Sequence, residues 1–275
     1  MRECVVIPAY NEAATIRDVV ARARAHCEHV IVVDDGSTDG TTQILSSLPV
    51  TVLTHAANRG KAAALSSGFE RALADGAAGV ITLDGDGQHR PEDVPRLREA
   101  ARRHPGCIVI GARLVGHESA PRKRYYANCV ANFWISWAAG YRIADSQSGF
   151  RYYPAALLRR VRVPHDRPHG FVFESEILIE AARLGVRSVP LAIEAIYAPN
   201  ARASHFRAVV DVVRITRMVA WKLLSRGLSP LGFARAFLWP RPVADCIDAA
   251  PVADTAGAAA DYHDYPRKLA GGKER

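Results

Sequence analysis

The chain has 275 residues, of which 49% are hydrophobic and 23% are charged. This length and composition support a large buried core, and they exclude disorder of the whole chain. The formal net charge is +8, and positive charge is concentrated between residues 202 and 226, where six Lys or Arg residues accompany one Asp. Such an excess favours an anionic partner, which is a nucleic acid, an anionic membrane surface or a phosphorylated substrate.

The five cysteines form no Cys-x-x-Cys pair, and their spacing suits neither a zinc site nor a dense set of disulfides. The first residues run directly into the apolar segment Cys4–Ile7, without a basic leader or a cleavage site. We therefore expect a cytoplasmic protein. The longest uncharged run, 125–141, has 17 residues and contains Asn, Ser and Gly, so no membrane-spanning helix is expected.

Short β-branched runs alternate with Ala-, Arg- and Leu-rich stretches over the first 115 residues. The expected strands are Cys4–Pro8, Val30–Asp34, Val50–Thr54, Val80–Asp84 and Cys107–Gly111, and the expected helices lie near 12–26, 39–47, 60–74 and 92–104. This alternation predicts βαβ units. The predicted fold class is therefore α/β, with a mostly parallel sheet flanked by helices.

After Arg113 the pattern changes. The expected elements are a helix near 122–139, a loop at 145–150, a helix near 174–184, a strand near 186–196 and an amphipathic helix from about 204 to 225. On a helical wheel, the last helix has Val213 and Leu224 on an apolar side and Arg214 and Lys222 on a cationic side. This helix either docks on anionic lipid headgroups or covers the sheet. From residue 241 onward we expect a flexible tail.

Polar clusters follow three of the expected strands, at Pro8–Glu12, Asp34–Ser37 and Asp84–Gln88. Because the carboxyl ends of parallel strands meet at one edge of a sheet, we expect these clusters to converge there. Asp84 and Asp86 are two residues apart in extended chain, so both side chains lie on one side, and Gln88 adds an oxygen at the next such position. These oxygens suit Mg²⁺ or Mn²⁺ bound jointly with a diphosphate.

Each cluster also has an ordinary structural explanation. Asp and Gly are common turn residues, which explains the segment from Asp84 without a metal. An Asp at the end of a strand, such as Asp34 or Asp35, often caps the following helix. Tyr10 is explained equally well by packing, and Glu12 by the dipole of a helix. An EF-hand is excluded, because Pro95 stands at the twelfth loop position.

Four motifs occur in a characteristic order, at Val6–Glu12, Val33–Thr41, Asn58–Lys61 and Leu83–His89. In these motifs and their order, the chain closely resembles the family 2 GT-A glycosyltransferases, especially the dolichyl/polyprenyl-phosphate mannose synthase-like branch. The resemblance continues through Gly111–Arg113, Asp145–Arg151 and Ser204–Arg207, and it covers about residues 4–210. It implies a GT-A domain at 1–226, with a nucleotide-sugar half at 1–115 and an acceptor half at 116–226. Residues 227–275 would be a C-terminal extension.

The resemblance also implies a UDP- or GDP-hexose donor at the sheet edge. The implied donor-binding residues are Pro8, Tyr10, Glu12, Asp34, Asp35, Lys61, Asp84, Gly85 and Asp86. The implied ligands of Mg²⁺ or Mn²⁺ are Asp84, Asp86 and Gln88. Such an ion neutralises the charge that develops on the departing nucleoside diphosphate.

For the acceptor, the resemblance implies a polyprenyl phosphate bound by Arg113, Arg124, Arg202 and Ser204. A phosphate monoester is largely ionised at neutral pH and attacks the anomeric carbon without a strong base, which inverts that centre. Asp145 orients the acceptor or accepts a proton, or it simply forms a turn. Asp145, Asp86 and Arg113 are the expected catalytic residues. Glu174 either organises the sugar pocket or complements a helix dipole.

The function predicted is that of a metal-dependent inverting glycosyltransferase, in peripheral contact with the cytoplasmic face of the membrane and without a nucleic-acid partner. Three alternatives stay open. A hydroxyl acceptor would require Asp145 as a general base. A sugar nucleotidyltransferase would carry a Gly-rich loop near the first strand, which Pro8–Glu12 lacks. A non-catalytic binding module would use the basic helix to bind nucleic acid.

Overall fold

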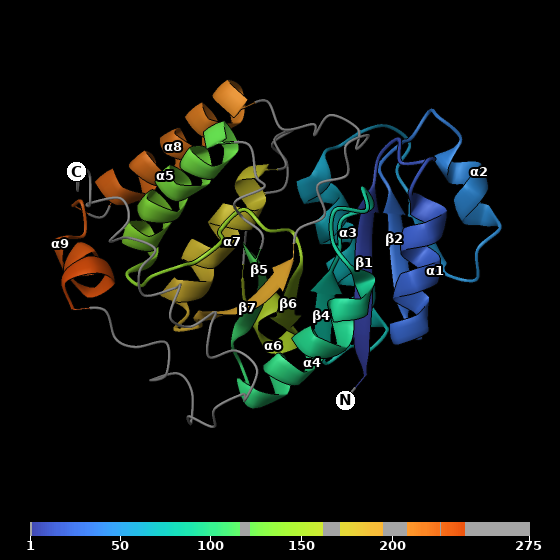
Figure 1. Cartoon of the computed structure of the whole chain (residues 1–275), viewed down its shortest axis with the longest axis horizontal. Coiled ribbons are helices and arrows are strands. Elements are labelled where there is room, and N and C mark those ends of the chain that lie inside the picture. Colours follow the sequence, from blue (N-terminus) through green and yellow to red (C-terminus); the bar gives the residue numbers. More distant parts are fainter. Residues whose placement is uncertain (1, 116–121, 162–170, 195–207, 226, 240–275) are drawn as a thin grey trace, which may run out of the picture.

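The computed structural model describes residues 2–115, 122–161, 171–194, 208–225 and 227–239 (Figure 1). In these residues, seven strands form one sheet in the order β3-β2-β1-β4-β6-β5-β7. The strands are β1 Glu3–Ala9, β2 Val30–Asp34, β3 Thr51–Thr54, β4 Gly79–Thr82, β5 Ile108–Val115, β6 Arg151–Pro154 and β7 Ser188–Glu194. The longer helices are α1 Ile16–His26, α3 Lys61–Ala74, α4 Val94–Arg103, α5 Arg122–Ala139, α7 Phe171–Arg183 and α8 Ala208–Leu224. The short ones are α2 Thr41–Ser46, η1 Pro91–Asp93, α6 Ala155–Leu158, α9 Pro230–Phe233 and the π-helical turn η3 Ala234–Leu238.

The predicted α/β fold with a mostly parallel sheet is confirmed. Strand β1 pairs in parallel with β2 and β4, β2 with β3, and β5 with β7. Strand β6 is antiparallel to both of its neighbours, β4 and β5. The sequence analysis missed β6 and α6, because the strand has only four residues, begins with an arginine and ends with a proline.

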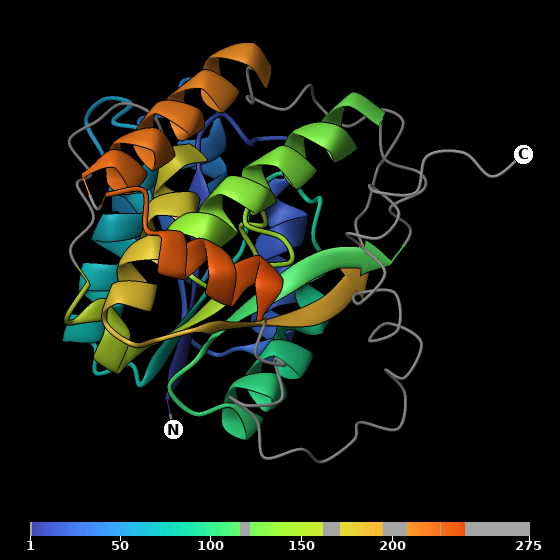
Figure 2. The same ribbon diagram turned by 90° about the vertical axis from the view of Figure 1, so that its left-hand side faces the viewer.

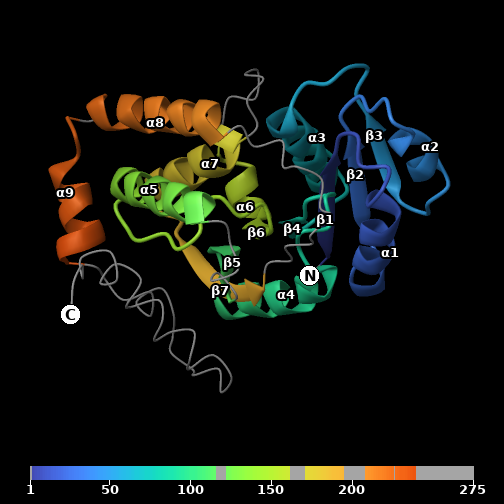
Figure 3. The same ribbon diagram turned by 45° about the horizontal axis from the view of Figure 1, so that its top comes forward.

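The sheet separates two apolar cores. Because side chains alternate along a strand, Val5 and Ile7 of β1 face one core and Cys4 and Val6 face the other. Helices α1, α2 and α4 cover the first face, and α3, α5, α7 and α8 cover the second. Figures 1 and 3 show the sheet between these layers, with α5, α7 and α8 gathered at one end of the molecule.

The loops after β1, β2 and β4 are joined to one another at the carboxyl edge of the sheet. Asn11 adopts a positive φ of 57°, and its Oδ1 accepts a hydrogen bond of 2.7 Å from the backbone N–H of Thr38. The Thr15 hydroxyl donates a hydrogen bond of 2.7 Å to the Gly85 carbonyl. These contacts confirm the expected convergence of the three polar clusters.

Helix α8 is oriented differently from the prediction of the helical wheel. Its buried residues are Ile215, Met218, Val219 and Leu223. Val213 and Leu224 are 51% and 64% exposed, whereas Lys222 faces α7 and forms ion pairs with Glu176 and Glu180. The wheel was wrong because it sorts residues by hydropathy alone, and the acidic side chains of α7 draw Lys222 inward. Residues 204–207 of the expected helix, and the expected tail from 241, lie outside the described residues.

None of the helices in the described ranges is long and apolar enough to cross a bilayer. The uncharged run at 125–141 lies largely within α5. This helix packs against α7, α8 and α9.

We expect the substitution Gly68→Val to destabilise the fold by about 2–3 kcal/mol, because overpacking a well-filled core forces its neighbours apart. A Cβ atom at Gly68 of α3 would overlap the Val6 side chain of β1 and press on Val33 of β2. Urea unfolding measures the effect, and Glu70→Ala on the exposed side of the same helix is the control. Equal stability of the two variants would contradict the close packing of α3 on the sheet.

Candidate functional site

Lys61 joins the two halves of the chain at the edge of the sheet. It is the first residue of α3, and its Nζ lies 2.6 Å from Asp84 Oδ1 and 2.8 Å from Glu174 Oε1. Burial alone would lower the pKa of Lys61, but the two carboxylates outweigh burial and raise it above its ordinary value. The ammonium group therefore stays charged between two acidic groups.

Asp84 follows β4 and lies against the backbone of Gly149. A Cβ atom at Gly149 would stand 2.5 Å from Asp84 Oδ2, so no larger residue fits there without displacing the carboxylate. Burial alone would raise the pKa of Asp84, but the charge of Lys61 outweighs burial and lowers it. Asp84 is consequently ionised at neutral pH.

Asp86 and Gln88 lie on the same loop, and both are half-buried. The backbone N–H of Gln88 donates a hydrogen bond of 2.9 Å to Asp86 Oδ1. Among the described residues, no group of three or more His, Cys, Asp or Glu side chains is arranged to hold a metal ion. Carboxylate and amide oxygens such as those of Asp84, Asp86 and Gln88 are the ligand type that suits Mg²⁺, which takes one or two carboxylates and completes its shell with water and substrate phosphate. A metal site on this loop stays a prediction.

Pro8, Tyr10 and Glu12 are half-buried at the end of β1, beside the loop of Asp84. The Glu12 backbone N–H donates a hydrogen bond of 2.9 Å to Thr41 Oγ1. The position of a Cβ on Gly85 would be 3.3 Å from the Pro8 carbonyl oxygen and 3.6 Å from Glu12 Cγ. Pro8, Glu12 and Gly85 therefore lie together, as expected of residues that share a binding site.

Asp34 and Asp35 both hold loops in place. Asp34 is fully buried and accepts hydrogen bonds from the Ser37 N–H and the Thr42 hydroxyl. Asp35 is also buried, and its carboxylate accepts backbone hydrogen bonds from Arg59 (3.0 Å) and Gly60 (2.7 Å). Neither carboxylate is the N-cap of the following helix α2, which is Gly40. Asp34 instead binds the Thr42 side chain of α2, and Asp35 binds the backbone just before α3. Binding of a donor by these two residues stays a prediction.

His55 is a partner of Asp35 that the sequence analysis missed. Its Nδ1 lies 2.6 Å from Asp35 Oδ1, and its Nε2 lies 3.0 Å from the Ser67 hydroxyl. The imidazole links the end of β3 to α3 and helps to fix the carboxylate of Asp35. A lone histidine after a strand carries no recognisable motif, so no local signal could have identified it.

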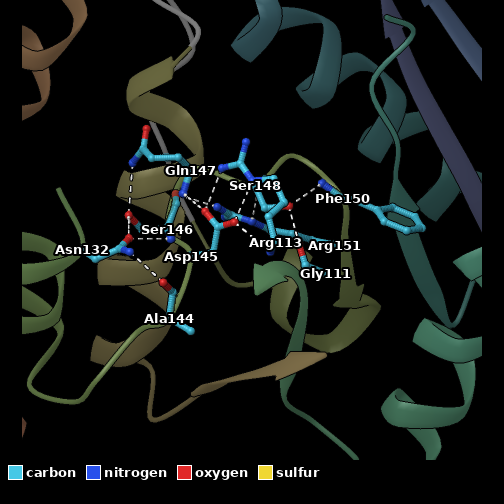
Figure 4. Close-up of polar contacts among 10 residues, drawn as sticks. All are labelled: Gly111, Arg113, Asn132, Ala144, Asp145, Ser146, Gln147, Ser148, Phe150 and Arg151. Carbon is cyan, nitrogen blue, oxygen red and sulfur yellow. Dashed lines mark hydrogen bonds and ion pairs between the residues drawn. The ribbon is translucent and has the colours of Figure 1, made fainter. Parts of the chain in front are cut away.

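Arg113 and Asp145 form a buried bidentate pair in the second half of the site (Figure 4). Arg113 Nε and Nη2 donate hydrogen bonds of 2.8 and 2.9 Å to the two oxygens of Asp145, and the Arg113 backbone N–H adds one of 3.1 Å. Burial alone would raise the pKa of Asp145, but the charge and hydrogen bonds of Arg113 hold it well below its usual range. Asp145 is therefore suited to orienting Arg113 and poorly suited to accepting a proton.

Arg151 organises the loop that carries Asp145. Its guanidinium group is fully buried and donates hydrogen bonds to the carbonyls of Ser148 (2.7 Å), Ser146 (2.8 Å) and Glu174 (2.6 Å). Neutral carbonyl oxygens therefore accept the hydrogen bonds of the charged guanidinium group. Through Glu174, these bonds also connect the loop that carries Asp145 to the start of α7. The sequence analysis quoted Arg151 only as the end of a motif and assigned it no role.

Asn132 of α5 holds the same loop from another side. Its Nδ2 donates a hydrogen bond of 2.6 Å to the Ala144 carbonyl, and its Oδ1 accepts hydrogen bonds from the N–H and the hydroxyl of Ser146. Figure 4 shows both contacts. A polar residue inside the uncharged run 125–141 was the signal available in the sequence, and the analysis used it only to exclude a membrane span.

His89 is a further buried group beside the site. Its ring lies 5.5 Å from the ring of Phe150, and its Nδ1 has no hydrogen-bond partner among the described residues. Burial lowers the pKa of His89 to about 4, so the imidazole is neutral at physiological pH.

Three of the expected acceptor residues are not placed by the structure. Arg124 belongs to the first turn of α5, but its side chain is outside the described part of the chain. Arg202 and Ser204 lie within 195–207, which the structure does not describe. Arg113 is therefore the one expected acceptor residue with a described environment.

The chain is similar in sequence to a known family and to characterised proteins. The model of the family described as "Glycosyl transferase family 2" matches residues 4–163. The undecaprenyl-phosphate mannosyltransferase of Micrococcus luteus is 31% identical over 243 residues, which are 82% of this chain and 96% of that protein. The polyprenol monophosphomannose synthase of Mycolicibacterium smegmatis is 30% identical over 203 residues, covering 70% of this chain and 76% of that protein.

A solved structure shares the fold. Glucosyl-3-phosphoglycerate synthase from Mycobacterium tuberculosis, crystallised with Mn²⁺, uridine diphosphate and phosphoglyceric acid, superposes with a TM-score of 0.58 at 23% identity. The match covers 82% of this chain and 78% of that chain. At this identity the likeness concerns the GT-A fold, which is the fold expected from the sequence.

The Arg113–Asp145 pair predicts a specific dependence of stability on pH. We expect Asp145→Asn to lower the free energy of unfolding at pH 7 by about 3 kcal/mol, because the Arg113 guanidinium group loses the carboxylate that accepts two of its hydrogen bonds and compensates its charge. The pKa of Asp145 is lowered by folding, so the pair contributes fully above the unfolded pKa of about 3.9 and its contribution is lost as the pH falls further. The difference between the two proteins should therefore be constant from about pH 8 to 5 and shrink below about pH 4.

Urea unfolding over this pH range measures the difference. The control is Asp75→Asn, which breaks an exposed ion pair with Arg71 and should cost under about 0.5 kcal/mol. A difference that stays constant below pH 4, or that is absent at pH 7, would show that Asp145 is not held ionised by Arg113.

Proposed function

Since the chain belongs to glycosyl transferase family 2 and is therefore a glycosyltransferase, we propose that it transfers a hexose from a nucleoside diphosphate sugar to a polyprenyl phosphate. Two relatives whose names state a polyprenyl-type phosphate or a polyprenol product support this acceptor. The observation that carries the proposal is the buried Arg113–Asp145 pair, which orients a guanidinium group that can bind an anion and makes Asp145 itself a poor base.

The donor would bind along the edge formed by Pro8, Tyr10, Glu12, Asp34, Asp35, Lys61, Asp84, Gly85 and Asp86. Asp84, Asp86 and Gln88 would hold Mg²⁺ or Mn²⁺, and this ion supplies a positive charge that stabilises the departing diphosphate. Lys61 is already charged beside Asp84 and offers a second cation for the phosphate oxygens. The expected role of Glu174 is to keep this ammonium group at the sheet edge.

On the acceptor side, Arg113 would bind two oxygens of the lipid phosphate, together with Arg124, Arg202 and Ser204. A third phosphate oxygen attacks the anomeric carbon of the hexose and forms a new C–O bond. The bond from this carbon to the nucleoside diphosphate breaks, and its electron pair leaves with the diphosphate. Attack from the side opposite the leaving group inverts the anomeric centre. Since the attacking oxygen is ionised near neutral pH, no proton has to be removed.

A hydroxyl acceptor is the nearest alternative, and the environment of Asp145 argues against it. A hydroxyl group needs a general base with a pKa near the working pH. Both oxygens of Asp145 accept hydrogen bonds from Arg113, and its pKa lies below the ordinary range. We therefore assign Asp145 the task of positioning Arg113. A polyprenyl phosphate acceptor also places the reaction at a membrane, in our proposal at the cytoplasmic face.

We expect Asp86→Asn to reduce transfer at least about a hundredfold, because the metal contributes several kcal/mol to stabilising the leaving group. The measurement is the transfer of labelled hexose from UDP- and GDP-sugars to a polyprenyl phosphate in Mn²⁺ or Mg²⁺, with chelation of the metal as a parallel arm. Asp18→Asn, which changes an exposed aspartate of α1, is the control and should behave as the unsubstituted chain. Full transfer by the Asp86 variant, or in the presence of EDTA, would refute the metal site.

We expect Arg113→Lys to raise the KM for polyprenyl phosphate at least about tenfold, because an ammonium group cannot form the bidentate contact of a guanidinium group. The KM for the nucleotide sugar should change little, since Arg113 belongs to the other half of the site. Arg102→Lys on the exposed side of α4 is the matched control. If the donor KM rises instead, Arg113 serves the donor and the assignment of the two halves is wrong.

A further inference from the structure

The exposed large apolar side chains of the described residues all lie after residue 125. We call them the outer apolar surface: Tyr126, Val130 and Phe133 of α5, Val213, Trp221 and Leu224 of α8, and Leu228, Leu231, Leu238 and Trp239 in the segment that follows. Trp221 and Trp239 are 73% and 69% exposed. Single exposed apolar residues are ordinary, whereas a concentration of them marks a surface that contacts another apolar phase.

Helix α5 carries apolar side chains on its outward side as well as on its buried side, where Cys129, Ala131 and Ile135 lie. Its buried side carries Asn132 and Ser136, which hydrogen-bond the chain at 143–146. Its outward side carries Tyr126, Val130 and Phe133, at spacings of four and three residues that align them along one face. A helix beside water normally presents its polar face outward, so this arrangement indicates an apolar environment outside α5.

Aromatic contacts join α5 to the segment that follows α8. The ring of Phe133 stacks on that of Phe237 at 4.9 Å, and Trp137 meets Phe233 edge-on at 5.2 Å. Helices α5 and α8 also pack against each other. Figure 2 looks onto this end of the molecule, where α8, α5 and the α9–η3 segment lie side by side in front of the sheet. The exposed residues therefore belong to one continuous layer.

The charges of the same elements are mostly positive, and Asp211 of α8 is the one acidic residue in α5, α8 and the α9–η3 segment. Residues 122–144 and 212–244 contain no Asp or Glu, and their basic residues are Arg122, Lys123, Arg124, Arg142, Arg214, Arg217, Lys222, Arg226, Arg235 and Arg241. Among the described side chains, Arg217 and Arg235 are exposed, whereas Lys222 is paired with α7. A partner with apolar and anionic groups complements this surface. A second copy of this chain fits the surface less well, because it would bring positive charges together. A nucleic acid also fits less well, because its phosphates would lie against the apolar side chains.

We propose that the outer apolar surface inserts into the headgroup region of an anionic lipid bilayer. Tryptophan and tyrosine prefer this region because their rings are apolar and their edges polar, and exposed arginines pair with anionic headgroups. This inference rests on the proposed function, in which the acceptor is itself a membrane lipid. Asn132 of α5 holds the loop of Asp145, so binding through α5 brings that loop to the bilayer. The proposed contact is therefore an apolar face formed by α5, α8 and α9–η3. It differs from the contact expected from the sequence, which was the cationic side of the helix at 204–225.

The test uses the full chain and vesicles of phosphatidylcholine with or without phosphatidylglycerol. We expect co-sedimentation with the anionic vesicles and quenching of tryptophan fluorescence by brominated lipid. The combined variant Trp221→Ser, Leu224→Ser and Trp239→Ser should lose binding at least about tenfold. Arg217→Glu with Arg235→Glu should weaken binding to the anionic vesicles by a similar factor. Arg24→Glu with Arg102→Glu, on α1 and α4, is the matched charge control and should bind as the unsubstituted chain.

Because the changed side chains are exposed, the variants should keep the circular dichroism and melting temperature of the unsubstituted chain. Equal binding by the variants, or no binding by the unsubstituted chain, would overturn the inference. So would self-association through this surface, seen by sedimentation velocity, or stronger binding to a nucleic acid than to vesicles. Vesicle binding without transfer to polyprenyl phosphate would overturn the proposed acceptor and leave the docking surface supported.

Discussion

The ammonium group of Lys61 is the link on which the site depends. Lys61 comes from the first half of the chain, at the start of α3, and it bridges Asp84 after β4 to Glu174 on α7. Three charged groups at a sheet edge would be costly if any one lacked a partner, because a buried charge loses its hydration. Their mutual compensation keeps Lys61 and Asp84 charged side by side, with Glu174 as the second partner of the ammonium group. The same bridge holds the two halves of the domain in one geometry.

The second half repeats this principle with arginines. Arg113 is compensated by a carboxylate, whereas Arg151 is compensated by three carbonyl oxygens of the chain itself. The two arginines therefore have different roles. Arg151 holds a loop, whereas Arg113 is a partly desolvated cation that Asp145 orients. An oriented guanidinium group loses less freedom when it meets a phosphate than a lysine on a mobile stem does. Asp145 is part of that preparation.

Much of the fold was predictable from the sequence, for identifiable reasons. Strands such as Val30–Asp34 are β-branched and fully buried, and their periodicity is a strong local signal. The convergence of Asp84 and Glu12 followed from a general rule of parallel sheets. Strand β6 was missed because its pairing on both sides is non-local and its composition is atypical. The orientation of α8 was mispredicted because Lys222 is held by α7, which no helical wheel can represent.

The site was predictable to the extent that its residues stand in ordered motifs. Asp84, Asp86 and Arg113 were found in this way, and the structure places Asp84 and Arg113 in ion pairs. His55, Asn132 and Arg151 were overlooked as site-forming residues, because their importance lies in contacts with residues distant in the sequence. Gly149 belongs with them, since its lack of a side chain matters only where Asp84 lies against it. Such supporting residues become visible only when the chain is folded.

The reversed direction of β6 has a consequence for how this architecture can diversify. In a parallel strand, the segment that reaches the functional edge is the one that follows the strand; in β6 it is the one that precedes it, Asp145–Phe150. That segment is anchored by α5 and α7, away from the turns after β1 and β2. Insertions or exchanges between α5 and β6 can therefore reshape the side of the candidate site that holds Arg113 and Asp145, while the loops after β1 and β2 keep their own scaffold. Because β6 runs antiparallel to its neighbours, the two sides of the candidate site can change independently in evolution.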